Sequence, residues 1–136
     1  MATQIFVNLS VSDLGKAVRF FEALGYSFNP QFTDEHASCL VISDTIYAML
    51  LTEARFKDFT KKAVVDATKS TEAIIALSAE DRAEVDTRVD RAMAAGASPA
   101  GDPMDLGFMY SRSFYDLDGH HWEYVWMDTA AMEQQQ

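Results

Sequence analysis

The spacing of apolar residues changes at intervals along the chain, and each change predicts a new element. Alternation over residues 7–11 predicts a β-strand, and apolar residues three or four positions apart after Asp13 predict a helix. Gly25 follows the last apolar residue of that helix and is typical of a helix end. Three later apolar segments, separated by polar residues, predict strands at 26–32, 38–42 and 45–51. The first half therefore predicts the order βαβββ.

The second half of the chain repeats this order. Residues 75–81 read Ile-Ala-Leu-Ser-Ala-Glu-Asp and are similar to residues 7–13, which read Val-Asn-Leu-Ser-Val-Ser-Asp. A helical spacing follows Asp81 and ends at Gly96. Strands are then predicted at 96–102, where small residues make the pattern weak, and at 107–115 and 120–127. The candidates for capping the two helices are Ser12 or Asp13 and Glu80 or Asp81.

Between the two repeats, residues 53–69 predict one or two helical turns around Phe56 and Phe59, followed by a polar linker. Two interpretations of this segment stay open: a flap over a binding site, or a surface helix with both Phe side chains anchored in the core. The sequence as a whole predicts a single domain, 1–136, with module one at 4–53, a linker at 54–69, module two at 70–128 and a C-terminal tail at 129–136. Residues 132–136 of this tail are expected to be frayed.

The alternation of each strand predicts which side chains lie under a helix and which line the opposite, cup-shaped surface. In the first strand the apolar residues belong under the helix, so Phe6 and Asn8 face the cup. By the same argument, Ile74 faces the cup in the second module. In the last strand, the large aromatic residues at 122, 124 and 126 belong in the core, which leaves His121 and Glu123 for the cup.

Composition limits the classes of partner. The chain has 136 residues, of which 49% are hydrophobic, so it can bury a core of useful size. Acidic residues outnumber basic ones by 21 to 11, and a net charge of −10 disfavours nucleic acids and anionic membranes. No apolar run reaches the roughly 18 residues of a membrane span, and no export signal is evident, so a cytoplasmic location is predicted. The single cysteine, Cys39, cannot form a disulfide within the chain.

Three segments together resemble a known superfamily. They are the opening strand and turn at 7–14, the helix end Phe-Phe-x-x-Leu-Gly at 20–25, and the closing turn Asp-Leu-Asp-Gly-x-x-x-Glu at 116–123. With the duplicated βαβββ order, they resemble the vicinal oxygen chelate superfamily, which contains glyoxalase I, bleomycin-resistance proteins, fosfomycin-resistance enzymes and extradiol dioxygenases. The resemblance covers residues 4–128. It implies an α+β fold in which tandem βαβββ modules form a curved, cup-like mixed sheet.

The resemblance also implies four metal-ligand positions, on the first and last strands of each module. Glu123 matches one of them, whereas the others fall on Phe6, Ile74 and Met49, with Tyr47 or Leu51 as alternatives to Met49. A divalent ion needs about three oxygen or nitrogen ligands, and these apolar residues offer none. We therefore expect no cofactor and no metal site of the usual kind.

One alternative metal site remains, formed by Glu123 with His121 and completed by His120 or His36. Such a site would take Zn, Ni, Mn or Fe. Without a metal, Glu123 is either a general acid or base in an apolar cup or a structural partner of Arg112. His121 is either a ligand or a hydrogen-bonding strand residue.

The remaining candidate site residues are predicted either to contact a small molecule or to fill the interior of the cup. Those on the cup surface are Phe6, Asn8, Tyr47, Met49, Leu51 and Ile74, and Tyr110 and Arg112 are candidates for polar contacts from the neighbouring strand.

Three functions follow from these alternatives. The first is a metal-independent binder of a small organic ligand, cationic or aromatic, similar to the bleomycin-resistance branch. The second is a metal-dependent enzyme that uses Glu123, either a glyoxalase-like lyase or isomerase or an extradiol-type dioxygenase. The third is an interaction module without catalysis. The resemblance further implies a homodimer.

Overall fold

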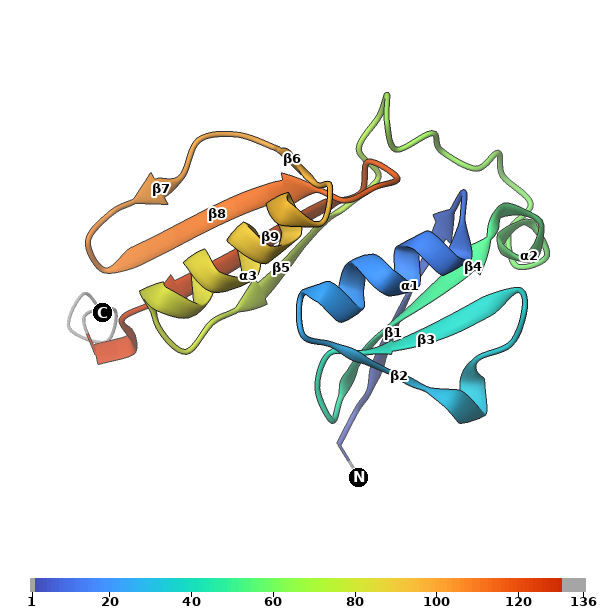
Figure 1. The fold of residues 1–136 in the computed structure, drawn as a ribbon, viewed down its shortest axis with the longest axis horizontal. Helices are drawn as coiled ribbons and strands as arrows, with labels where there is room; N and C mark the ends of the chain where they lie inside the picture. The colour runs from blue at the N-terminus through green and yellow to red at the C-terminus, as the bar shows by residue number, and fades with distance from the viewer. Residues whose placement is uncertain (1, 131–136) are drawn as a thin grey trace. The chain divides into compact units, whose positions relative to one another are not determined.

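The computed structural model describes residues 2–130 (Figure 1). It divides the chain into two compact units, the first ending at Asp66 and the second beginning at Ala67. The segment predicted to be frayed, 132–136, lies outside the described residues. No helix among residues 2–130 combines the length and the apolar character needed to cross a bilayer.

The first unit contains a four-stranded sheet in the order β1-β4-β3-β2. Strands β1 and β4 run parallel, and the other neighbours are antiparallel. Its elements are β1 (Ile5–Val11), α1 (Leu14–Ala23), β2 (Ser27–Asn29), a 3₁₀ turn (Pro30–Phe32), β3 (Ala37–Val41), β4 (Ile46–Thr52) and α2 (Glu53–Lys57).

The second unit repeats this topology in the order β5-β9-β8-β6, again with the first and last strands parallel. A short additional strand, β7, pairs with β8 and was not predicted. Its elements are β5 (Ile74–Ser78), α3 (Arg82–Ala94), β6 (Ser98–Pro99), β7 (Met104–Asp105), β8 (Met109–Tyr115) and β9 (His121–Met127). Both sheets are open and mixed, so the predicted α+β fold of tandem βαβββ modules is confirmed.

Both long helices begin and end as the sequence predicts. The carboxylate of Asp13 accepts a hydrogen bond from the amide of Lys16 at 3.0 Å, and the carboxylate of Asp81 accepts one from the amide of Glu84 at 2.8 Å. These bonds satisfy amides that the first helical turn leaves without a partner. Both helices are followed by a glycine with positive φ, 104° at Gly25 and 112° at Gly96.

Two predicted strands are much shorter than expected. The segment 26–32 forms only β2, because the side chain of Asn29 accepts the amide of Gln31 at 2.9 Å and starts a 3₁₀ turn at Pro30. Pro30 has no N–H to donate to a sheet. The segment 96–102 likewise forms only the two residues of β6.

Each helix covers one face of its own sheet, as Figure 1 shows. Helix α1 buries Phe20 and Phe21 against the sheet, whose residues on that face include the buried Leu9 and Leu50. Helix α3 packs on β8 and β9 and buries Val85, Val89 and Ala92. Buried residues on that face of the second sheet are Leu77, Phe114, Trp122 and Tyr124. The predicted alternation is therefore confirmed in both units.

The segment after β4 differs from the expectation that both phenylalanines anchor it. Phe56 is half-buried on α2, but Phe59 lies beyond the helix and is 74% exposed. The interpretation as a surface helix with two core anchors is therefore wrong at Phe59, because α2 ends at Lys57.

Candidate functional site

The face of the first sheet away from α1, here called the α1-distal face, presents an aromatic pair. Phe6 on β1 lies opposite Tyr47 on β4, and their rings stack with centroids 4.9 Å apart and planes 11° from parallel. Phe6 is 46% exposed. The hydroxyl of Tyr47 donates to the carbonyl of Asp44 at 3.0 Å, which fixes the direction of the ring.

The superfamily resemblance implies two metal-ligand positions in this unit, Phe6 and Met49. Both lie on the α1-distal face, and neither offers an oxygen or nitrogen donor. The register places Asn8 opposite Met49, and Met49 is the counterpart of Glu123 in the second unit. The amide of Asn8 donates to the carbonyl of Phe6 at 3.1 Å. A phenyl ring and a thioether do not bind the hard or borderline divalent ions of this superfamily, so these residues do not fit the group.

The equivalent surface of the second sheet, the α3-distal face, is more polar. Glu123 is half-buried between two small neighbours, Ala76 on β5 and Ser113 on β8. His121 lies opposite Ile74, and its ring meets that of Tyr115 edge-on at 5.3 Å. Glu123 therefore faces away from α3, as the alternation predicts.

The carboxylate of Glu123 has no hydrogen-bond or ion-pair partner among residues 2–130. It can therefore accept a proton or a hydrogen bond from a bound molecule without first breaking an internal contact. Whether it acts as a catalytic acid or base stays a prediction.

Tyr110 and Arg112 lie on the opposite side of the second sheet from Glu123. The hydroxyl of Tyr110 donates to Asp86 at 2.6 Å, and Arg112 contacts the carboxylates of Asp86 and Asp90 on α3 at 3.0 and 2.9 Å. The predicted alternative of a pair between Glu123 and Arg112 is therefore wrong, because alternation turns Arg112 to the helix. Tyr110 and Arg112 thus lie on the helix side of their sheet, and whether they contact a ligand stays a prediction.

These contacts shift the pKa values of Asp86 and Tyr110 in the directions expected of a structural network. The Tyr110 hydroxyl, followed by the Arg112 guanidinium, lowers the pKa of Asp86. The same hydrogen bond to Asp86 raises the pKa of Tyr110. The side chains thus fasten α3 to β8.

Each of the two other histidines lies close to a glutamate of its own unit. Nδ1 of the buried His120 lies 2.8 Å from Oε1 of Glu72, and His36, in the first unit, lies 3.4 Å from Glu35. Within the described range 2–130, no three His, Cys, Asp or Glu side chains are grouped so that they could hold a metal ion.

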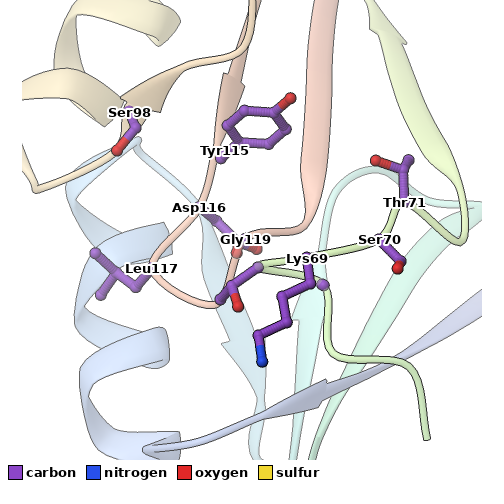
Figure 2. Close-up of a pocket in the computed structure, with 10 residues that line it drawn as sticks. Lys69, Ser70, Thr71, Ser98, Tyr115, Asp116, Leu117 and Gly119 are labelled. Atoms are coloured by element: carbon purple, nitrogen blue, oxygen red, sulfur yellow. The ribbon is translucent and has the colours of Figure 1, made fainter.

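A pocket of about 360 Å³ lies within the second unit, at the end of its sheet (Figure 2). Two segments form most of it: the approach to β5 and the turn between β8 and β9. Its lining residues are Ala67, Thr68, Lys69, Ser70, Thr71, Ser98, Tyr115, Asp116, Leu117 and Gly119. Sequence reasoning missed this pocket because the two segments are far apart in the chain, although the hydroxyl-rich run 68–71 was a signal.

The turn at the pocket is organised by the buried carboxylate of Asp116. One oxygen accepts the amides of Asp118 at 2.9 Å and His120 at 3.0 Å, and the other accepts Nε1 of Trp122 at 2.9 Å. Burial raises the pKa of Asp116 despite these hydrogen bonds and the nearby His120. The carboxylate of Asp116 therefore stabilises the turn between β8 and β9.

Comparison with known proteins agrees with the fold and with the N-terminal sequence. Residues 3–43 match the family model described as bleomycin resistance protein-like N-terminal. Hypothetical protein SA1046 from S. aureus is 29% identical, with a TM-score of 0.76 over 92% of this chain and 94% of that one. Among curated proteins, none matches this chain.

Two more distant solved structures share the fold. A glyoxalase/bleomycin resistance protein/dioxygenase family enzyme from Burkholderia phytofirmans PsJN is 14% identical, with a TM-score of 0.75 over 93% of this chain and 99% of that one. The fosfomycin resistance protein FosX from Mesorhizobium loti is 18% identical, with a TM-score of 0.69 over 98% of each chain. These two structures show the fold, and together with the family-model match over residues 3–43 they agree with the resemblance to the vicinal oxygen chelate superfamily.

Proposed function

We propose that this protein binds a small, flat organic ligand, cationic or aromatic, on the α1-distal face, without the divalent metal of the superfamily's enzymes. The observation that carries the proposal is the stacked pair of Phe6 and Tyr47, of which Phe6 is 46% exposed. An exposed aromatic pair costs free energy in water and offers a ready surface for another ring.

The charge of the chain supports a cationic ligand. A net charge of −10 attracts cations to the surface, and a cation over an aromatic ring gains about 0.5–2 kcal/mol, depending on its desolvation. The match of residues 3–43 to a bleomycin-resistance-like model supports the same class of function, because it covers β1, where Phe6 lies.

Titration with ethidium and with metal-free bleomycin tests the proposal, since each combines flat rings with positive charge. Binding followed by fluorescence should weaken about tenfold in Phe6→Ala and Tyr47→Ala, which remove one ring each. Tyr47→Phe is the matched control: it keeps the ring, loses only the bond to Asp44, and should bind nearly as the wild type does. Equal binding by all four proteins contradicts the proposal.

Phe59→Ala tests the flap interpretation in the same titration. Phe59 is 74% exposed and outside the stacked pair, so its loss leaves affinity unchanged if the segment is only a surface loop. A weaker affinity together with faster dissociation would assign it to a flap.

A second candidate is a metal-dependent enzyme that uses Glu123. It is favoured by the carboxylate of Glu123, which lies on the face of His121 and has no partner among the described residues, 2–130. Glu123→Gln distinguishes it from the binder, because glutamine keeps the size of the side chain and removes the charge. Stoichiometric Ni, Zn, Mn or Fe in purified wild-type protein, lost in Glu123→Gln, would overturn the metal-free proposal.

We also propose a homodimer, as the superfamily resemblance implies. Sedimentation at micromolar concentration measures it directly, and a monomer at that concentration contradicts it.

A further inference from the structure

We propose that the pocket of the second unit is a binding site for a small oxyanion, a phosphoryl or carboxylate group. This site is separate from the proposed aromatic site, since none of its lining residues belongs to the first unit. Its volume, about 360 Å³, lies near the lower end of the range of small-molecule sites.

The two segments that line the pocket are held in place by contacts within the unit. At Gly119, where φ is 90°, a Cβ would lie 2.7 Å from the carbonyl oxygen of Ala67, so the turn and the approach to β5 are in close contact. The hydrogen bond between His120 and Glu72 at 2.8 Å joins the same two segments a few residues further on. A ligand would therefore meet a preformed pocket and would lose little affinity to ordering it.

The groups left for a ligand are mainly hydrogen-bond donors. The ammonium of Lys69 and the hydroxyls of Ser70, Thr71 and Ser98 have no hydrogen-bond or ion-pair partner among residues 2–130, and Figure 2 shows them around the turn. Lysine only donates, and each hydroxyl can donate one hydrogen. Such a set suits a ligand rich in acceptors.

The one carboxylate in the pocket does not favour a cation instead. Both oxygens of Asp116 already accept hydrogen bonds from its own turn and from Trp122, and its burial disfavours the charged form. Lys69 is thus the charged side chain in the pocket that stays available, and it is positive. These observations select an anion over a cation.

Amide NMR titration of the full chain tests the site, with inorganic phosphate and acetate as separate probes at constant ionic strength. We expect saturable shifts in residues 67–71 and 115–119. Saturation by phosphate alone assigns a phosphoryl group, whereas saturation by both assigns any small oxyanion.

Lys69→Gln should weaken that binding about tenfold, as expected for loss of a charge-assisted hydrogen bond. Lys62→Gln is the matched control, because it removes the same charge from a lysine outside the pocket. Non-saturable shifts with both probes, or equal weakening by the two variants, would overturn the proposal. Phe6→Ala should leave phosphate binding unchanged, so failure of this site and of the aromatic site can be told apart.

Discussion

The α1-distal and α3-distal faces share a backbone and differ in chemistry. In both units the first and last strands pair in parallel, and Phe6 and Tyr47 correspond in register to Ile74 and His121. The first face presents stacked rings, whereas the second presents an imidazole and a carboxylate that has no partner in the described part of the chain. The two units therefore share their helix caps and strand pairing, and they differ in the side chains on these faces.

The turns that precede the last strands differ as strongly as the faces. In the second unit, Asp116 accepts three hydrogen bonds from buried or part-buried donors. The register makes Ile42 its counterpart in the first unit, and an isoleucine side chain accepts none. The second turn therefore depends on one carboxylate.

Removing the Asp116 carboxylate should destabilise the protein more than any other substitution proposed in this section. Asp116→Ala leaves the indole N–H of Trp122 and two amides without their acceptor, which should lower the free energy of unfolding by about 3 kcal/mol. Urea denaturation followed by Trp fluorescence measures it. Asp44→Ala, in the corresponding turn of the first unit, is the control and should change stability by less than about 0.5 kcal/mol. Similar losses in both variants would mean that the hydrogen bonds of Asp116 contribute little.

Removing the N-cap of either long helix should cause a smaller loss of stability, of similar size in the two units. Asp13→Ala and Asp81→Ala each remove one N-cap and should each cost about 1 kcal/mol, because both carboxylates accept the amide three residues later. Thermal unfolding of the two variants gives the comparison. Asp81→Asn keeps a capping oxygen and should recover most of the loss. A large inequality between the two alanine variants would show that the caps are not equivalent.

The smallest expected change in stability comes from the ion pair of Arg82 with Asp105, which has no counterpart at the equivalent position of the first unit. Arg82, whose counterpart in the first repeat is Leu14, binds Asp105 through two bonds of 2.9 and 2.8 Å. This contact, followed by the hydrogen bond that the Gly107 amide donates at 2.9 Å, lowers the pKa of Asp105 to about 2. Because the folded-state pKa lies below the ordinary value, the stabilisation is present above about pH 4 and is lost as the pH falls towards 2.

Carboxyl NMR titration checks the shift. Arg82→Gln should raise the pKa of Asp105 towards its ordinary range, although the Gly107 amide still lowers it in that variant. Arg88→Gln, which removes an arginine of α3 that pairs with Glu84, should leave the pKa of Asp105 unchanged. An Asp105 pKa that does not rise in Arg82→Gln would contradict the assigned cause.

Features of the two units that depend on local sequence pattern, namely the strand faces and the helix caps, are predicted correctly from the sequence. Two-residue alternation places Phe6 and Glu123 on the faces away from the helices, and Asp and Gly at the helix ends predict both caps. Those rules act over a few residues, which is why they succeed in both repeats.

Contacts between distant residues could not be predicted in the same way. Arg112 is 26 positions from Asp86, and no periodicity links them. The pocket likewise depends on contact between residues 67–71 and 115–119. The exposure of Phe59 was missed because apolar character indicates a core position only while the helix continues, and α2 ends at Lys57.

The contact between Gly119 and Ala67 has a practical consequence for dividing the gene. If the second unit is expressed alone, a start at Ile74 would discard Ala67 and Glu72, which contact the β8–β9 turn, although every strand would be retained. A start near Val65 keeps both residues. The boundary of this unit as an independently expressed fragment is therefore set by a loop contact, several residues before its first strand.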